Sequence, residues 1–204
     1  MTDADNGNNS VFRHHRAEIW DELNDHLVAE QGTWDGAPIR VEHGPFEVTL
    51  DQHAEVIGRA SIVQTRLRAA FHNRDGFRFR LRRHDWLVNI AVMLGAQDLQ
   101  IGDQAFDDAF VVSANDEERA RQVLADPSLR ARMVSSDLDL VEVKDDEGWF
   151  GPEFPPEVDE LCLCSRDRQS DPDRLADLYA LFADILNRLC HLGAAYEEDP
   201  QVEL

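Results

Sequence analysis

The sequence predicts an α+β fold: an antiparallel sheet of about six to seven strands with helices packed mainly on one face and a long C-terminal helix. Two patterns indicate this class. Strand-like runs with alternating polarity follow one another closely between residues 39 and 83, and more of them recur later. The clearest amphipathic stretch lies near the C-terminus, so a long helix is expected to cover the sheet.

The length of 204 residues and a hydrophobic content of 43% fit one domain with short tails. Residues 1–10 are polar and predict a disordered tail. Residues 11–196 are expected to form the single domain, and residues 197–204 an acidic tail. From residue 11 to about residue 31 apolar side chains recur at helical spacing, which predicts an amphipathic helix.

Four strands are expected next, separated by Gly-containing turns, and their closeness predicts an antiparallel meander. They are Ile39–Glu42, Phe46–Gln52, Ile62–Ala70 and Phe77–Arg83. Residues 86–94 follow as a short helix that is apolar on nearly every side.

The second half alternates short strands and helices. Strands are expected at Phe110–Ser113, Leu138–Lys144 and Glu160–Cys164, with a helix from about residue 115 to 125 and another beginning at Asp126-Pro127. In the last helix Asp171 is the cap, Pro172 is the first helical residue and Gly193 is the stop.

The chain is strongly acidic, with 41 Asp and Glu against 20 Lys and Arg and a net charge of −21. Such a charge either attracts cationic partners or keeps a protein soluble in a saline cytoplasm, where salt screens self-repulsion. The acidic blocks are short, which favours the second explanation and a halophilic bacterium. No secretion signal is visible at residues 1–10, and charges interrupt the stretch 175–196, so we expect a cytoplasmic protein without a membrane span.

One segment reverses this charge, because residues 57–84 contain eight arginines and one acid, Asp75. Strand alternation places Arg66 and Arg68 on one face of their strand, and Arg78, Arg80 and Arg82 on one face of another. Two neighbouring strands of this kind form a basic face that can bind a polyanion. Alternatively, Glu47 and Asp51 of a third strand pair with the arginines. We favour pairing, since the aromatic side chains needed for base stacking lie on the opposite face.

Two features are candidate contact surfaces for a partner. Trp149, Phe150 and Phe154 stand in a loop rich in Gly and Pro, which is a recognition loop if exposed and a plug over the core if folded inward. The apolar helix at residues 86–94 is the other surface, because such a helix is either buried or docked on a partner.

The three cysteines favour a reducing compartment over a disulfide framework. Cys162 and Cys164 alternate on one strand, and Cys190 with His191 lies on the last helix, so together they are a weak candidate for a four-ligand metal site. We expect no metal there, because zinc sites usually have wider C-x₂₋₄-C spacing and a buried free cysteine is an ordinary small hydrophobe.

No motif for nucleotide binding, zinc-dependent hydrolysis or a nucleophile elbow is present, and the single lysine, Lys144, lies at an acidic strand end. We therefore assign no catalytic residue and expect no cofactor.

Residues 98–134 combine an acidic segment with Phe106 and Phe110 four apart, a strand, and two capped helices. This stretch resembles an uncharacterised bacterial domain family of unknown function, and Asp-Glu-Gly-Trp-Phe-Gly at 146–151 is similar to stand-alone hypothetical proteins of this length. The resemblance implies a fold unit and no catalytic residue. Where that family carries membrane segments, this chain differs by having none.

The sequence thus predicts a non-catalytic cytoplasmic binding or adaptor module of a halophilic bacterium, with an unidentified protein partner, as a monomer or homodimer. The alternative is a polyanion or nucleic-acid binder that uses the arginine face. A second alternative is an enzyme with an unrecognised site.

Overall fold

The computed structural model describes residues 11–29, 34–57, 60–84, 98–145, 154–202 and 204. It confirms the α+β class, because seven antiparallel strands form one sheet accompanied by helices. The strands are β1 (Ile39–His43), β2 (Phe46–Ile57), β3 (Ala60–His72), β4 (Phe79–Arg83), β5 (Phe110–Ala114), β6 (Leu138–Lys144) and β7 (Val158–Ser165). The helices are α1 (Val11–Ala29), α2 (Gln104–Ala109), α3 (Glu117–Val123), α4 (Pro127–Ser135) and α5 (Pro172–His191).

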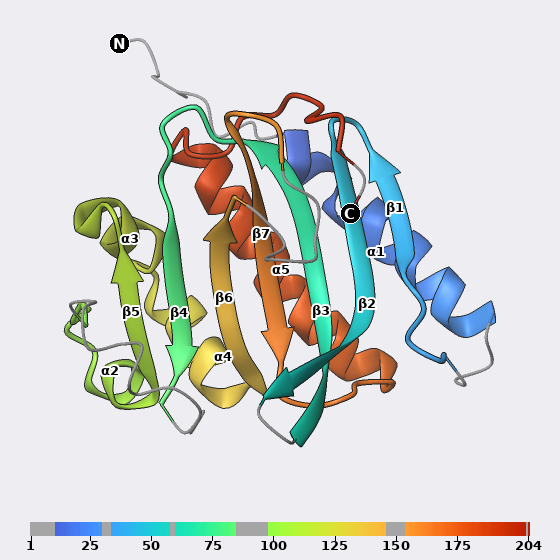
Figure 1. Ribbon diagram of the computed structural model, residues 1–204, viewed down its shortest axis with the longest axis horizontal. Helices are drawn as coiled ribbons and strands as arrows, with labels where there is room; N and C mark the ends of the chain where they lie inside the picture. Colours follow the sequence, from blue (N-terminus) through green and yellow to red (C-terminus); the bar gives the residue numbers. More distant parts are fainter. Residues whose placement is uncertain (1–10, 30–33, 58–59, 85–97, 146–153, 203) are drawn as a thin grey trace, which may run out of the picture.

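The strand order is β1-β2-β3-β7-β6-β4-β5 (Figure 1). Among the described strands, only the first three, β1, β2 and β3, form a meander, so the predicted four-strand meander is wrong at β4. Asn73 explains how the chain leaves β3, because its side-chain amide donates to the carbonyl of Phe77 at 2.8 Å and also contacts Asp159 of β7. These contacts lie at the end of β7 where Asp159 stands, and the next strand, β4, pairs with β6 and β5.

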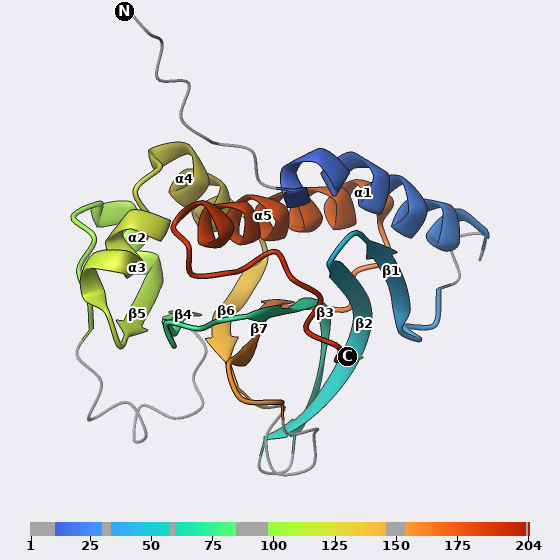
Figure 2. The same ribbon diagram turned by 90° about the horizontal axis from the view of Figure 1, so that it is seen from above.

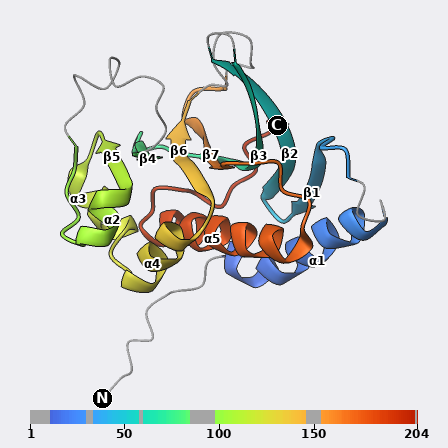
Figure 3. The same cartoon turned by 90° about the horizontal axis from the view of Figure 1, so that it is seen from below.

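The helices lie on one face of the sheet (Figures 2 and 3). α5 crosses behind the central strands, α1 lies beside it toward β1, and α2, α3 and α4 lie toward β5. No helix of the described part of the chain covers the opposite face, which we call the open face.

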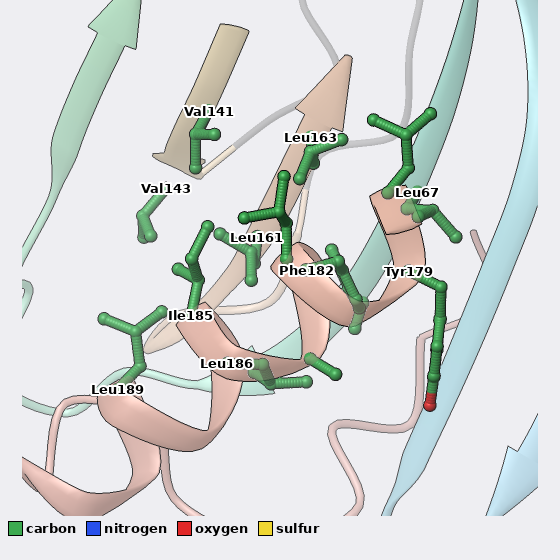
Figure 4. Packing of buried hydrophobic residues seen from close by; sticks show 14 of the residues in the cluster. Leu67, Val141, Val143, Leu161, Leu163, Tyr179, Phe182, Ile185, Leu186 and Leu189 are labelled. Atoms are coloured by element: carbon green, nitrogen blue, oxygen red, sulfur yellow. The ribbon is translucent and has the colours of Figure 1, made fainter. Parts of the chain in front are cut away.

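The core between α5 and the sheet follows from two periodicities. Asp171 caps α5, since its carboxylate accepts from the backbone N–H groups of Asp173 and Arg174. The apolar stripe of α5 then meets alternate residues of β3, β6 and β7 (Figure 4). The packed side chains are Leu67, Val141, Val143, Leu161, Leu163, Phe182, Ile185, Leu186 and Leu189. Burial of this stripe is the main stabilisation of the helix layer.

α1 joins the core through one face and joins α5 through polar contacts. Trp20 stacks on Tyr179 with ring centroids 5.5 Å apart, and the Tyr179 hydroxyl donates to the backbone carbonyl of Arg16 at 2.8 Å. Burial raises the pKa of Tyr179 far above its ordinary value, so the phenol stays protonated. Arg16 also forms an ion pair with Asp184 of α5.

Two short elements differ from the sequence prediction. α2 was not expected, because six residues are too few to show a helical period, although its cap Asp103 is a standard start signal. The helix expected from about residue 115 begins at Glu117, since Asp116 supplies the capping carboxylate to the N–H of Arg119.

The C-terminal segment lies over one end of the open face, in front of β2 (Figure 1). Leu204 is buried with Ala70 and Val158, and its backbone carbonyl accepts from Arg40 Nε at 2.6 Å. Glu47 accepts the backbone N–H of Leu204 at 3.1 Å. The acidic segment is therefore anchored at its end to β1, β2 and β3.

Candidate functional site

The strand register aligns polar residues in rows across the open face. One row runs from Thr49 through Arg68, Cys162 and Glu142 to Arg80, and it crosses β2, β3, β7, β6 and β4. The next row runs from Asp51 through Arg66, Cys164 and Leu140 to Arg82. The predicted alternation is confirmed, because Phe77, Phe79 and Leu81 are buried in the core.

Asp51 binds the two arginines of β3. Its carboxylate accepts from Arg66 Nε at 2.8 Å and Arg66 Nη2 at 2.7 Å, and from Arg68 Nη2 at 2.8 Å. The side chains of Asp51 and Arg68 are only 6% and 7% exposed, so this is a buried charge cluster. The predicted pairing of the arginines with Asp51 is therefore confirmed, whereas Glu47 holds the C-terminal segment.

The arginines of the second group lie on β4 or just before it, and two strands stand between β4 and β3. Arg80 Nε donates to Glu142 Oε2 at 2.7 Å, and Arg78 binds Asp159 with two 3.0 Å bonds and Asp145 at 2.7 Å. The hydrogen bond to Asp159 raises the pKa of Arg78. The prediction that the two arginine groups stand on neighbouring strands is wrong, because β7 and β6 separate them. The open face thus has alternating charges rather than one continuous basic stripe.

A pocket of about 220 Å³ lies between the two arginine groups. β7 and β6 form its floor, and side chains from β2, β3 and β4 form its walls. It is lined by His53, Gln64, Arg66, Arg80, Arg82, Asp139, Leu140, Glu142, Lys144, Cys162 and Cys164. Among the described residues that line it, four are cationic and two are anionic, so the lining itself carries more cations than acids in a chain of net charge −21.

The two thiols on the pocket floor are close together, with 3.6 Å between Cys162 Sγ and Cys164 Sγ. The hydrogen bond to Cys164, together with burial, raises the pKa of Cys162 well above its ordinary value. A protonated thiol is a weak nucleophile and a weak metal ligand, so this arrangement does not favour catalysis at Cys162.

The weak metal candidate formed by Cys162, Cys164, Cys190 and His191 is not assembled. Leu161 and Leu163 of β7 point toward α5, so strand alternation turns Cys162 and Cys164 to the open face (Figure 4). Cys190 and His191 lie at the end of α5, on the other side of the sheet. The sheet itself separates the two pairs.

The candidate contact surfaces lie mostly outside the described residues. Residues 86–94 are outside them, and so are Trp149 and Phe150, so both surfaces stay predictions. Phe154 is described, and it packs half-buried against Ala70, Val158 and Leu204.

Sequence reasoning missed the pocket because its floor and walls together come from five strands whose order is set by long-range pairing. The sequence indicated only that Glu142 and Lys144 lie on the same face of the strand expected at 138–144, where they could line a common surface. Nothing in the chain marks His53 or Gln64 as their neighbours.

Comparisons with family models, with curated proteins and with solved structures find no match to this chain. The resemblance of residues 98–134 to an uncharacterised bacterial domain family therefore stays a prediction. Among the described helices, none combines the length and the apolar character needed to cross a membrane.

Proposed function

We propose that this chain is a non-catalytic binding module that holds an anionic group of its partner in the pocket on the open face. The observation that carries the proposal is the basic lining of that pocket within a strongly acidic chain. Potentials of one sign in a cleft with low-dielectric walls concentrate ligands of the opposite sign.

The arrangement of the ion pairs supports an anionic ligand. The Arg80 side chain is 52% exposed, whereas that of its partner Glu142 is only 9% exposed. Lys144 is likewise more exposed than Glu160, which lies 3.4 Å from it and is fully buried. The carboxylates therefore hold the cations from below, and both cations line the pocket. Cations fixed in this way bind an anion with little loss of side-chain entropy.

The pocket fits one compact group better than a polymer. The described residues that line it include no Phe, Tyr or Trp, so they offer no platform for stacking bases. The separation of the two arginine groups by β7 and β6 also interrupts the track that a phosphate backbone follows. We therefore place a carboxylate or a phosphate group of a protein partner ahead of a nucleic acid.

The proposal includes the absence of a catalytic activity. The raised pKa of Cys162 keeps that thiol protonated on the pocket floor and so argues against Cys162 as a nucleophile. We also propose a cytoplasmic location in a halophilic bacterium, because a net charge of −21 is tolerated best where salt screens it.

The test is isothermal titration of the chain with sodium phosphate, with citrate and with a single-stranded oligonucleotide. Wild type is compared with Arg80→Ala, and Arg121→Ala is the matched control, since it removes an exposed arginine paired with Glu117 on α3. We expect saturable binding of citrate or phosphate that Arg80→Ala weakens at least about tenfold and Arg121→Ala leaves unchanged. Oligonucleotide binding alone supports the polyanion alternative, and equal binding by both variants overturns the assignment of the pocket.

A further inference from the structure

Two histidines and two glutamates meet where α1 packs beside the end of β1. His15, Glu18 and Glu22 are spaced by three and four residues, which places them on one face of α1. His43 is the last residue of β1 and faces them. His15 Nδ1 lies 2.8 Å from Glu18 Oε2, and His43 Nδ1 lies 3.9 Å from the same oxygen.

These groups have the separations that a small metal ion needs. One ring nitrogen of His15, one of His43 and a carboxylate oxygen of Glu18 all lie within 4.8 Å of one another. In a tetrahedral zinc site with bonds of about 2.0–2.2 Å, neighbouring ligand atoms are about 3.3–3.6 Å apart. The separations of 2.8 and 3.9 Å lie on either side of that range, so small rotations of three partly or fully exposed side chains reach it.

Glu22 adds a contact that metal-binding histidines usually have. Its Oε2 atom lies 3.1 Å from His43 Nε2, the ring nitrogen on the far side from Glu18. A carboxylate in this position fixes the tautomer of the imidazole, so that the other nitrogen presents its lone pair to a metal. The ring centroids of His15 and His43 are 5.7 Å apart, and the two ring planes are tilted by 33°.

We propose that His15, Glu18 and His43 bind a divalent transition-metal ion of the zinc type, with Glu22 orienting His43. Imidazole with one carboxylate is a donor set that suits zinc and its neighbours, whereas Mg²⁺ and Ca²⁺ prefer oxygen ligands alone. The fourth position is open to water. The bound ion joins α1 to β1, two elements that the sequence places about one loop apart, and it stabilises their contact because the unfolded chain lacks the assembled site.

The test uses the full chain freed of metal with a chelator and titrated with Zn²⁺ by calorimetry, in the presence of Mg²⁺ to saturate the acidic surface. We expect one ion per chain and a higher melting temperature with Zn²⁺ than without it. The double variant His15→Ala/His43→Ala is expected to lose this binding and the shift, and Glu22→Gln to weaken binding about 10- to 100-fold.

The control is His26→Ala, which removes an exposed histidine from the same helix and is expected to change nothing. Far-UV circular dichroism of each chelator-treated variant checks that it is folded. If the double variant is unfolded, the Zn²⁺ affinity of Glu22→Gln still tests the proposal, since this variant keeps the shape of the side chain. The proposal is overturned if wild type shows no saturable Zn²⁺ binding. It is also overturned if Glu22→Gln and the double variant bind Zn²⁺ with the same affinity as wild type.

Discussion

Replacing Asp51 with Asn tests how much the buried charge cluster of the open face contributes to stability. The Asp51 carboxylate accepts three hydrogen bonds of 2.7–2.8 Å from Arg66 and Arg68, and Arg68 is nearly inaccessible to water. Removing one partner of a buried ion pair typically costs about 3–5 kcal/mol, because the other charge stays buried without compensation. Glu160 Oε2 still lies 3.7 Å from Arg68 Nη1, which places the expected loss near the lower end, about 3 kcal/mol.

The assay is urea unfolding followed by circular dichroism at a fixed KCl concentration. For a chain of this size a loss of about 3 kcal/mol also lowers the melting temperature by about 6–12 °C. Asp137→Asn is the matched control, since it breaks an exposed 3.0 Å pair with Arg174 and is expected to cost less than about 1 kcal/mol. If Asp51→Asn costs no more than this control, the cluster is not an important source of stability.

Four further outcomes are expected. The melting temperature rises as KCl increases from about 0.1 M to about 1 M, because salt screens the repulsion within a chain of charge −21; a flat curve argues against the halophile proposal. Asp171→Ala lowers the unfolding free energy by about 1 kcal/mol through loss of the α5 cap, and an unchanged urea midpoint contradicts this role. Burial raises the pKa of Tyr179, so the stability that its neutral phenol contributes is complete below about pH 10 and is lost as the pH rises further. The Tyr179→Phe variant is expected to lose less free energy of unfolding in alkaline buffers than wild type, as measured by urea unfolding at each pH. Iodoacetamide modifies the half-buried Cys190 before Cys162, whose thiol is buried and has a raised pKa; mass spectrometry showing the reverse order refutes this.

Local patterns were sufficient for most of the elements. Alternation predicted all seven strands to within a few residues at most ends, and the capping sequence Asp171-Pro172 predicted the start of α5. The order of the strands was not predictable in the same way, because pairing of β4 with β6 depends on residues far apart in the sequence. The turn at Asn73, whose side chain contacts Asp159 of β7, lies where the chain leaves β3.

In the candidate sites, too, contacts between strands that are neighbours in the chain were predictable, and contacts between distant elements were not. Pairing of Asp51 with Arg66 was predictable, since the two strands are neighbours in the chain and their polar faces match. The separation of Cys162 from Cys190 was also accessible from the sequence, because the apolar Leu161 and Leu163 face the helix and leave the thiols on the other side. The meeting of His15 with His43 was not, since it requires the packing of α1 against β1.

The central claim is that the open-face pocket holds an anionic group of a partner. Native mass spectrometry of the chain purified at high salt, together with its absorbance ratio at 260 and 280 nm, tests this most directly when wild type is compared with Arg80→Ala/Lys144→Ala. The proposal predicts an anionic adduct, either co-purified or formed with millimolar citrate or phosphate, that wild type retains and the double variant loses. An adduct retained equally by both chains, or a wild-type chain that binds neither anion, contradicts it.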